Sequence, residues 1–321
     1  NQTAAPDGTN TADKVEEQNT NNTFHFVTRS LWESSAGVKT FSAYVKADER
    51  SFAGLTLRVN GGSDRLAVLF NLTSGTVSDT LTAGSPTQTS SSIQDVGNGW
   101  YRCSISAYHS AGNVIALLSP HDDGTSSTIN LDYAGIVGHG IYIWGAQAEA
   151  GAFPTSYIPT TGSAVTRAKD VASASSFKYH QNSTQGTLYV AFTPNVDSSN
   201  FLRVAEFGYS NLRFSIQIVN GAIRHYTRNA ANNTNNVIGT PYLYTLNSTQ
   251  KTAFTVSAGY AAQSTNGTNA QSETDVLGLN ESNVGFYIGR SGSGAQLNGH
   301  IKQIQYYPKR LSNAQLQALT S

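Results

Sequence analysis

The stretch Gly140–Asp170 reads GIYIWGAQAEAGAFPTSYIPTTGSAVTRAKD and decides how the chain is divided. Its first residues, around Trp144, are β-branched and aromatic, which predicts a strand. Further regular structure is then interrupted by Gly145, Gly151, Pro154, Pro159 and Gly162. We therefore expect the last strand of one β domain here, followed by a linker to a second domain.

Short runs of strand-forming residues separated by turn residues fill the first half of the chain. They predict strands at Thr40–Lys46, Phe52–Val59, Leu66–Asn71, Trp100–Ala107, Val114–Ser119 and Gly140–Gln147. The turns between them are predicted to use positive φ at Asn60-Gly61-Gly62, Ser74-Gly75, Asn98-Gly99 and Asp123-Gly124. Many short strands without a convincing helix predict an antiparallel sandwich.

The second half repeats this pattern and then changes it at the end. Strands are predicted at Gly186–Thr193, Leu202–Gly208, Phe214–Val219, Ala222–Thr227, Lys251–Ala258 and Phe286–Gly289, with a hairpin at Asn220-Gly221. A final strand contains Ile301, Ile304 and Tyr306. Ser312 is predicted to cap a short helix that carries Leu316 and Leu319 on one face. The fold class is therefore all-β, with two tandem antiparallel β-sandwiches and a short C-terminal helix.

The composition limits the partners that this chain can attract. Of 321 residues only 12% are charged, and the formal net charge is zero, so nothing steers the protein to nucleic acid. No run of about 18 apolar residues predicts membrane insertion. Asn, Thr, Ser, Gln and Gly must provide the polar surface, which suits extracellular β proteins and virion parts.

The single cysteine, Cys103, is expected to pack as a small apolar group in a strand. The chain has no Met and begins at Asn1, so we expect it to be a fragment or a processed product.

Two long phrases resemble proteins of tailed bacteriophages. Gly140–Asp170 is similar to a segment that recurs in their tail and fibre proteins after a carbohydrate-binding-like jelly roll. FSAYVKADERSFAGLTL (41–57), LFNLTSGTV (69–77) and DVGNGWYRCSISA (95–107) resemble consecutive parts of that jelly roll. LNGHIKQIQYYPKRLSNAQLQAL (297–319) is similar to the end of concanavalin-A-like, laminin-G-like domains in the same proteins.

The resemblance implies a domain plan. Residues 1–150 would form the jelly roll, lacking its first strand, 151–173 a linker rich in Gly, Pro, Ser and Thr, and 174–321 the concanavalin-A-like sandwich. It also implies a virion or extracellular location, contacts with other virion proteins, and a homo-oligomer, a trimer if the protein is a fibre.

Sugar-binding sites stack pyranose rings on aromatic side chains and add hydrogen bonds from neutral groups or arginine. The predicted carbohydrate-binding residues are Trp32, Arg224, Tyr226, Arg228, Tyr242 and Tyr244. Trp32 precedes the first clear strand, so a rim or inter-domain position is expected. The tyrosines flank an Asn-rich segment, 229–239, that is long enough for a recognition loop. The alternative is that these tyrosines only cover the edge of the sandwich. Trp100 and Trp144 lie inside strand runs and are expected in the core.

A calcium site is the one cofactor that the sequence suggests. His121-Asp122-Asp123-Gly124 offers carboxylates on a turn, and the predicted ligands are Asp122 and Asp123. A simple turn explains the same composition. No His or Cys pair has the spacing of a zinc site.

Catalysis is weakly indicated. Glu273 and Asp275 are spaced to share one strand face, but the third carboxylate of a glucanase pattern is absent. The segment Arg224-His225-Tyr226 with Arg228 has residue types found in lyases, yet strand alternation places His225 opposite its neighbours.

The sequence therefore predicts a non-enzymatic phage virion protein, a fibre, tail appendage or capsid-surface component, that binds host-surface polysaccharide. A polysaccharide depolymerase and a purely architectural virion protein remain as alternatives.

Overall fold

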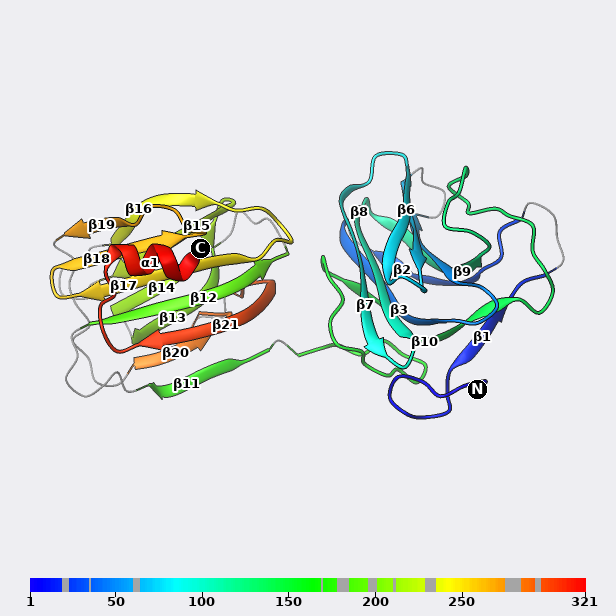
Figure 1. The fold of residues 1–321 in the computed structure, drawn as a ribbon, viewed down its shortest axis with the longest axis horizontal. Helices are drawn as coiled ribbons and strands as arrows, with labels where there is room; N and C mark the ends of the chain where they lie inside the picture. The colour runs from blue at the N-terminus through cyan, green and yellow to red at the C-terminus, as the bar shows by residue number, and fades with distance from the viewer. Residues whose placement is uncertain are drawn as a thin grey trace. The chain divides into compact units, whose positions relative to one another are not determined.

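The computed structural model describes residues 1–18, 23–34, 36–59, 64–168, 170–177, 185–195, 201–209, 212–228, 235–274, 284–291 and 296–321. Contacts divide the chain into a first unit, Asn1–Thr166, and a second unit, Arg167–Ser321. Figure 1 shows that each unit is built of strands, and that one short helix lies near the C-terminus. The predicted all-β class is confirmed.

The first unit contains two five-stranded antiparallel sheets. The order in one sheet is β1-β10-β3-β8-β7, with bounds Asp13–Glu16, Gly140–Ala150, Gly37–Ala47, Trp100–His109 and Thr87–Gly97. The order in the other is β2-β9-β4-β5-β6, with bounds Val27–Ser34, Gly112–His121, Phe52–Val59, Arg65–Asn71 and Thr76–Ala83.

The core of the first unit follows from strand alternation. On β3, Phe41, Ala43 and Val45 are buried and belong to one apolar cluster with residues of β4, β5, β8 and β9. Cys103 is fully buried in this cluster, as predicted, and burial raises the pKa of its thiol. The thiol is therefore a packed apolar group and not a nucleophile.

Two predicted turns differ in their outcome. Asn98 (φ 54°) and Gly99 (φ 78°) both have positive φ between β7 and β8, as a two-residue hairpin requires. In Asp123-Gly124 neither residue has positive φ among the described residues, so this prediction is wrong. The turn there is held instead by the Asp123 carboxylate, which accepts a hydrogen bond from the Thr125 backbone N–H at 2.9 Å. Residues 60–62 lie outside the described residues.

The segment after β10 packs back onto the first unit. The Glu149 carboxylate accepts hydrogen bonds from the Thr155 backbone N–H (2.9 Å) and hydroxyl (2.7 Å). Gln147 Oε1 accepts from the Ile158 N–H at 2.9 Å, and the Tyr157 ring lies 4.6 Å from that of Trp144. The sequence of this segment thus has a structural role, since residues 155–158 are held against strand β10, which precedes them in the chain.

Trp100 and Trp144 both contact the N-terminal residues of the first unit. Trp100 is buried, in a small cluster with Ala5 and Ala12, and its ring N–H donates to the Ala4 carbonyl at 3.1 Å. Trp144 is half-buried and donates to the Thr11 hydroxyl at 3.0 Å. The core prediction is confirmed for Trp100, which is 1% exposed, and is wrong for Trp144, which is only half-buried. The N-terminal residues cover these rings.

The second unit contains a six-stranded and a five-stranded antiparallel sheet. The order in the larger is β11-β20-β13-β14-β15-β16, with bounds Ala172–Phe177, Val284–Ile288, Leu202–Tyr209, Leu212–Val219, Ala222–Arg228 and Asn235–Leu243. The order in the smaller is β19-β18-β17-β12-β21, with bounds Gln271–Thr274, Tyr260–Thr265, Gln250–Ser257, Gly186–Pro194 and Gly299–Tyr307.

The sheets of the second unit enclose one apolar core, and the helix covers an outer face. Phe207, Phe214 and Phe254 are buried in the core, and the last two rings are stacked 4.2 Å apart. Helix α1 (Asn313–Thr320) begins with a capping box at Ser312, as the sequence predicts. Its Leu316 and Leu319 pack in a separate cluster with residues of β12, β17 and β18.

Strands with few apolar residues were not predicted. The omitted strands are β1, β2, β6, β7, β11, β16, β18 and β19. β7, with the sequence TQTSSSIQDVG, is mostly exposed and forms one edge of its sheet. Edge strands of this kind lack the apolar alternation on which the prediction relies.

Two corrections concern predicted recognition elements. Trp32 does not precede the first strand, because it lies within β2 and its Cα is paired with that of Val114. Residues 235–239 of the predicted recognition loop belong to strand β16, and residues 229–234 lie outside the described residues.

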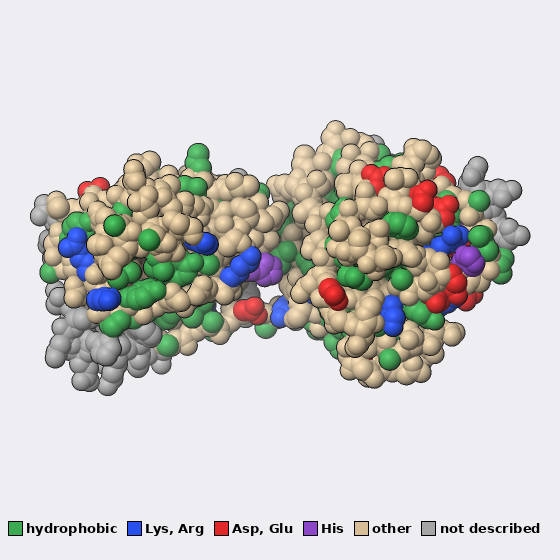
Figure 2. All heavy atoms as spheres, viewed as in Figure 1, with side chains coloured by type: hydrophobic (Ala, Val, Ile, Leu, Met, Phe, Trp, Pro, Cys, Tyr) green, Lys and Arg blue, Asp and Glu red, His purple; other side chains and the backbone are tan. Residues whose placement is uncertain are grey.

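In the described ranges no helix is long and apolar enough to cross a membrane. Figure 2 shows charged side chains spread thinly among neutral ones over the visible face, in line with the low charged fraction.

Candidate functional site

Strand β15 separates its side chains onto two faces. Ile223, His225 and Thr227 are buried, whereas Arg224, Tyr226 and Arg228 are only partly buried. Ile223 belongs to the apolar core between the sheets, so the other three residues lie on the outer face of the six-stranded sheet. Three of the six predicted carbohydrate-binding residues are therefore brought together.

His225 faces the core and cannot join them. Its Nε2 lies 2.7 Å from the Thr252 hydroxyl, and its ring contacts Phe254 edge-on at 5.2 Å. Burial lowers the pKa of this histidine to about 3. The ring is thus neutral and shielded from ligand, as alternation predicted, which removes the proton-transfer group of a lyase from the outer face.

A bulge in β13 adds an ion pair to the outer face. Arg203 pairs with Gln217 and Ala205 with Ile216, so Val204 is the extra residue, and both Val204 and Ala205 are buried in the core. Arg203 and Glu206 consequently lie on the same face, and Arg203 Nε donates to Glu206 Oε2 at 2.9 Å. Both are closely covered, at 8% and 3% exposure.

The strand register assembles these residues into two rows across the sheet. One row runs from Tyr287 through Glu206 and Ser215 to Tyr226. The other runs from Arg203 through Gln217 to Arg224. We call the outer-face set the arginine face, defined as Arg203, Glu206, Ser215, Gln217, Arg224, Tyr226, Arg228 and Tyr287.

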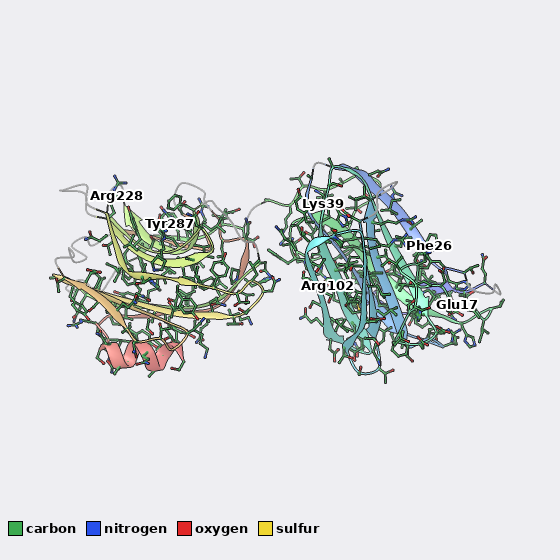
Figure 3. All side chains as sticks on the ribbon, turned by 90° about the horizontal axis from the view of Figure 1, so that it is seen from above. Glu17, Phe26, Lys39, Arg102, Arg228 and Tyr287 are labelled. Carbon is green, nitrogen blue, oxygen red and sulfur yellow. The ribbon has the colours of Figure 1, made fainter. Side chains whose placement is uncertain are left out.

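Hydrogen bonds between buried polar side chains of the arginine face hold these rows in place. Gln217 Nε2 donates to the Ser215 hydroxyl at 2.7 Å, and both residues are buried. In Figure 3 the labelled side chains of Arg228 and Tyr287 lie on the same side of the second unit, opposite helix α1. Arg290 lies with its guanidinium carbon 6.0 Å from the centre of the Tyr287 ring. A buried polar layer thus supports a surface of guanidinium groups and tyrosine rings.

The remaining predicted sugar contacts are elsewhere. Tyr242 is paired with the core residue Ile223, and both Tyr242 and Tyr244 pack against the apolar core. They do not share the arginine face, because both rings pack against the apolar core. Trp32 lies in the first unit, on β2.

Sequence reasoning missed Arg203, Glu206, Ser215, Gln217 and Tyr287. The sequence of β14 does contain a signal, because polar and apolar residues alternate in it. Ser215 and Gln217 alternate with Phe214, Ile216 and Ile218. For Arg203 and Glu206 no such signal exists, since simple alternation assigns them to opposite faces.

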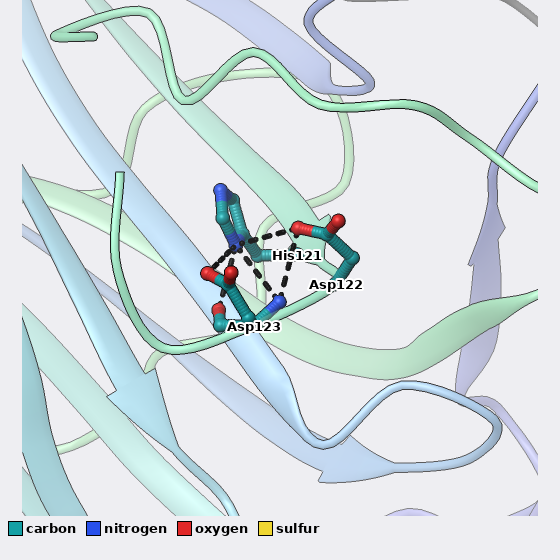
Figure 4. A group of neighbouring side chains, drawn as sticks. All are labelled: His121, Asp122 and Asp123. Atoms are coloured by element: carbon teal, nitrogen blue, oxygen red, sulfur yellow. Dashed lines mark hydrogen bonds and ion pairs between the residues drawn. The ribbon is translucent and has the colours of Figure 1, made fainter. Parts of the chain in front are cut away.

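The predicted calcium ligands lie at the end of β9 (Figure 4). His121, Asp122 and Asp123 form the one cluster of three metal-ligand side chains found in the described part of the chain. His121 Nδ1 lies 2.6 Å from the Asp123 carbonyl oxygen, a contact that requires Nδ1 to carry its hydrogen and donate. That nitrogen is then not a metal ligand.

The carboxylates of Asp122 and Asp123 also accept hydrogen bonds from nearby backbone N–H groups. Asp122 Oδ1 accepts from the Asp123 backbone N–H at 3.0 Å, and Asp123 Oδ1 accepts from Thr125. Two exposed carboxylates fall short of the six to eight oxygen ligands that calcium takes. Calcium binding at Asp122 and Asp123 stays a prediction, and the donor set does not fit it well.

The predicted carboxylate pair of a hydrolase is not seen as a site. Glu273 is exposed on β19, an edge strand, and Asp275 lies outside the described residues.

Comparison with known proteins gives distant similarities. No family model and no curated protein matches the chain. The carbohydrate-binding module CBM40 of Ruminococcus gnavus IT-sialidase, bound to α2,3-sialyllactose, is similar at 18% identity over 42% of this chain and 82% of that chain (TM-score 0.38). Domain 4 of an extracellular arabinanase from Geobacillus stearothermophilus, in complex with arabinotriose, is similar at 16% identity over 48% and 82% (TM-score 0.41). A heptameric pentraxin from Limulus polyphemus is similar at 16% identity over 43% and 70% (TM-score 0.36). These likenesses are too distant to support any functional inference.

Proposed function

We propose that this chain is a non-catalytic, glycan-binding structural protein of a tailed-phage particle, and that the arginine face is its sugar-binding surface. The observation that carries the binding role is the placement of Arg224, Tyr226 and Arg228 on one face of β15, above a buried polar layer. Guanidinium groups donate to sugar oxygens, and a tyrosine ring packs against a pyranose.

The virion role is supported by the resemblance of Gly140–Asp170 and of residues 297–319 to phage tail and fibre proteins. In that setting the protein is exposed outside the host cell, contacts other virion proteins, and binds polysaccharide on the host surface. If it is a homo-oligomer, repeated weak sites add up to firm attachment, because the second binding event is intramolecular.

A purified sample should be applied to an array of immobilised neutral and acidic oligosaccharides, with calcium and again with chelator, while released sugar is assayed. We expect saturable binding without release. Tyr226→Ala should lower binding at least tenfold, whereas Tyr108→Ala, which removes an exposed tyrosine from the first unit, should leave it unchanged. Binding to no glycan would favour an architectural virion protein, and release of oligosaccharide would favour a depolymerase.

A further inference from the structure

The arginine face carries more positive than negative charge. The chain as a whole has 20 basic and 20 acidic residues, so a local surplus is not a consequence of composition. Glu206 is the one carboxylate in the set, and Arg203 already balances it at 2.9 Å. Arg224 has no ion pair with any described residue, and the same holds for Arg290 beside Tyr287.

The register extends this surplus along the strands. Arg228 follows Arg224 by four residues on the same face of β15, about 13 Å along the strand. Arg224 and Arg228 thus flank Tyr226 along β15, and Glu206, the only acid of the arginine face, lies in the buried layer.

Donor groups on this face also lack acceptors. Arg203 Nη1 and Arg224 Nε are buried and have no hydrogen-bond partner in the described part of the structure. A buried donor without an acceptor is unfavourable, and a guanidinium cannot avoid this cost by losing its proton. A planar carboxylate fits two adjacent guanidinium N–H groups, and the charge makes these hydrogen bonds about twice as strong as those to a neutral hydroxyl.

We propose that the arginine face selects acidic glycans. Arg224 would hold the carboxylate of one uronic or sialic acid residue and Arg228 that of another, and the ring of Tyr226 would pack against the sugar between them. The buried pairs Arg203–Glu206 and Gln217–Ser215 act as positioning residues. They form the polar layer against which Arg224 and Arg228 lie. This inference rests on the proposed glycan-binding function and specifies its ligand class.

The test compares one polymer with and without its charge. Polygalacturonate and the same polymer with its carboxyl groups reduced to primary alcohols should be titrated against the full chain, with polysialate as a second acidic probe. We expect binding of at least one acidic polymer, at least tenfold weaker binding of a reduced polymer, and loss of affinity with rising salt. Equal affinity for polygalacturonate and its reduced form would overturn acid selection and leave glycan binding intact. Failure of both acidic polymers, while neutral glycans bind on the array, would overturn it too.

Variants separate a built site from a general charge effect. Arg224→Gln and Arg228→Gln should each weaken binding of the acidic polymer at least tenfold without changing the unfolding midpoint. Arg310→Gln is the matched control, because Arg310 is exposed in the same unit but stacks on Tyr260 of the other sheet, 3.8 Å from the ring centre. An equal loss in Arg310→Gln, or equally tight binding of dextran sulfate, would show a nonspecific charge effect and contradict the proposal.

Discussion

Arg203 Nε lies 2.9 Å from Glu206 Oε2, and the two side chains share one face of β13 although they are three residues apart in a strand. The bulge at Val204 makes this possible, because one extra residue shifts the alternation by one position. The pair is buried, so each charge depends on the other for its stabilisation.

Breaking this pair should destabilise the second unit. Arg203→Met removes the guanidinium that donates to the buried Glu206 carboxylate, and we expect a loss of about 3–5 kcal/mol in the free energy of unfolding. The double variant Arg203→Met with Glu206→Met should recover most of that loss. Denaturant unfolding measures both, and a double variant as unstable as the single one would contradict the interpretation.

His225 should make the second unit sensitive to acid. Its pKa is lowered from 6.5 to about 3 by burial, so the unfolded chain binds a proton between these pH values and the folded chain does not. Stability from the neutral ring is therefore complete above pH 6.5 and falls as pH decreases towards 3, by up to about 4 kcal/mol.

His225→Gln should reduce this pH dependence, whatever it does to stability at pH 7. Hydrogen exchange of peptides from β14 and β15, measured at pH 7 and pH 4, localises the effect. The same acid response in the variant would assign it to another group.

The buried carboxylate of Glu17 should affect the stability of the first unit at a lower pH than His225 affects the second. Glu17 accepts hydrogen bonds from Arg50 Nε (2.6 Å), from the Tyr133 hydroxyl (2.7 Å) and from the Ile136 N–H (2.8 Å). Burial raises the pKa of this carboxyl, but hydrogen bonds from Arg50, Ile136 and Tyr133 outweigh it and lower the pKa below 4.5. Its contribution is therefore present above pH 4.5 and is lost as pH falls through the lowered value.

The matched variants are Glu17→Gln and Glu16→Gln. Because Glu17→Gln leaves Arg50 without its carboxylate, we expect a loss of about 3 kcal/mol in the first unit. Glu16 is exposed and should change stability by less than about 0.5 kcal/mol. Thermal unfolding at pH 7 measures both, and equal effects would show that the Glu17 cluster is not a stabilising centre.

The packing of residues 155–158 against strand β10 should depend on Glu149. Glu149→Ala removes the acceptor for the Thr155 N–H and hydroxyl. We expect faster hydrogen exchange and faster proteolysis in residues 151–162, with the core strands of the first unit unchanged. Glu273→Ala, which removes an exposed carboxylate, is the control. Unaltered proteolysis in Glu149→Ala would mean that the Tyr157–Trp144 contact alone holds the segment.

The sequence by itself determined the fold class, the terminal helix and the separation of faces on β15. These features depend on local patterns: turn residues, a capping box at Ser312, and an alternation of apolar and polar side chains in AIRHYTR (222–228) that puts Arg224, Tyr226 and Arg228 opposite His225. A period of two is a property of the strand, so it needs no knowledge of the neighbours.

Only the tertiary structure decided which residues join those three. Strand order places β14 beside β15 and β13 beside β14, and this supplies Gln217, Ser215 and Arg203 from positions up to 25 residues away. The bulge at Val204 brings Glu206 to the same face, and β16 turns Tyr242 inward although its sequence suggests a recognition loop. Register and bulges are set by packing between strands that are distant in the chain, and therefore no local pattern contains them.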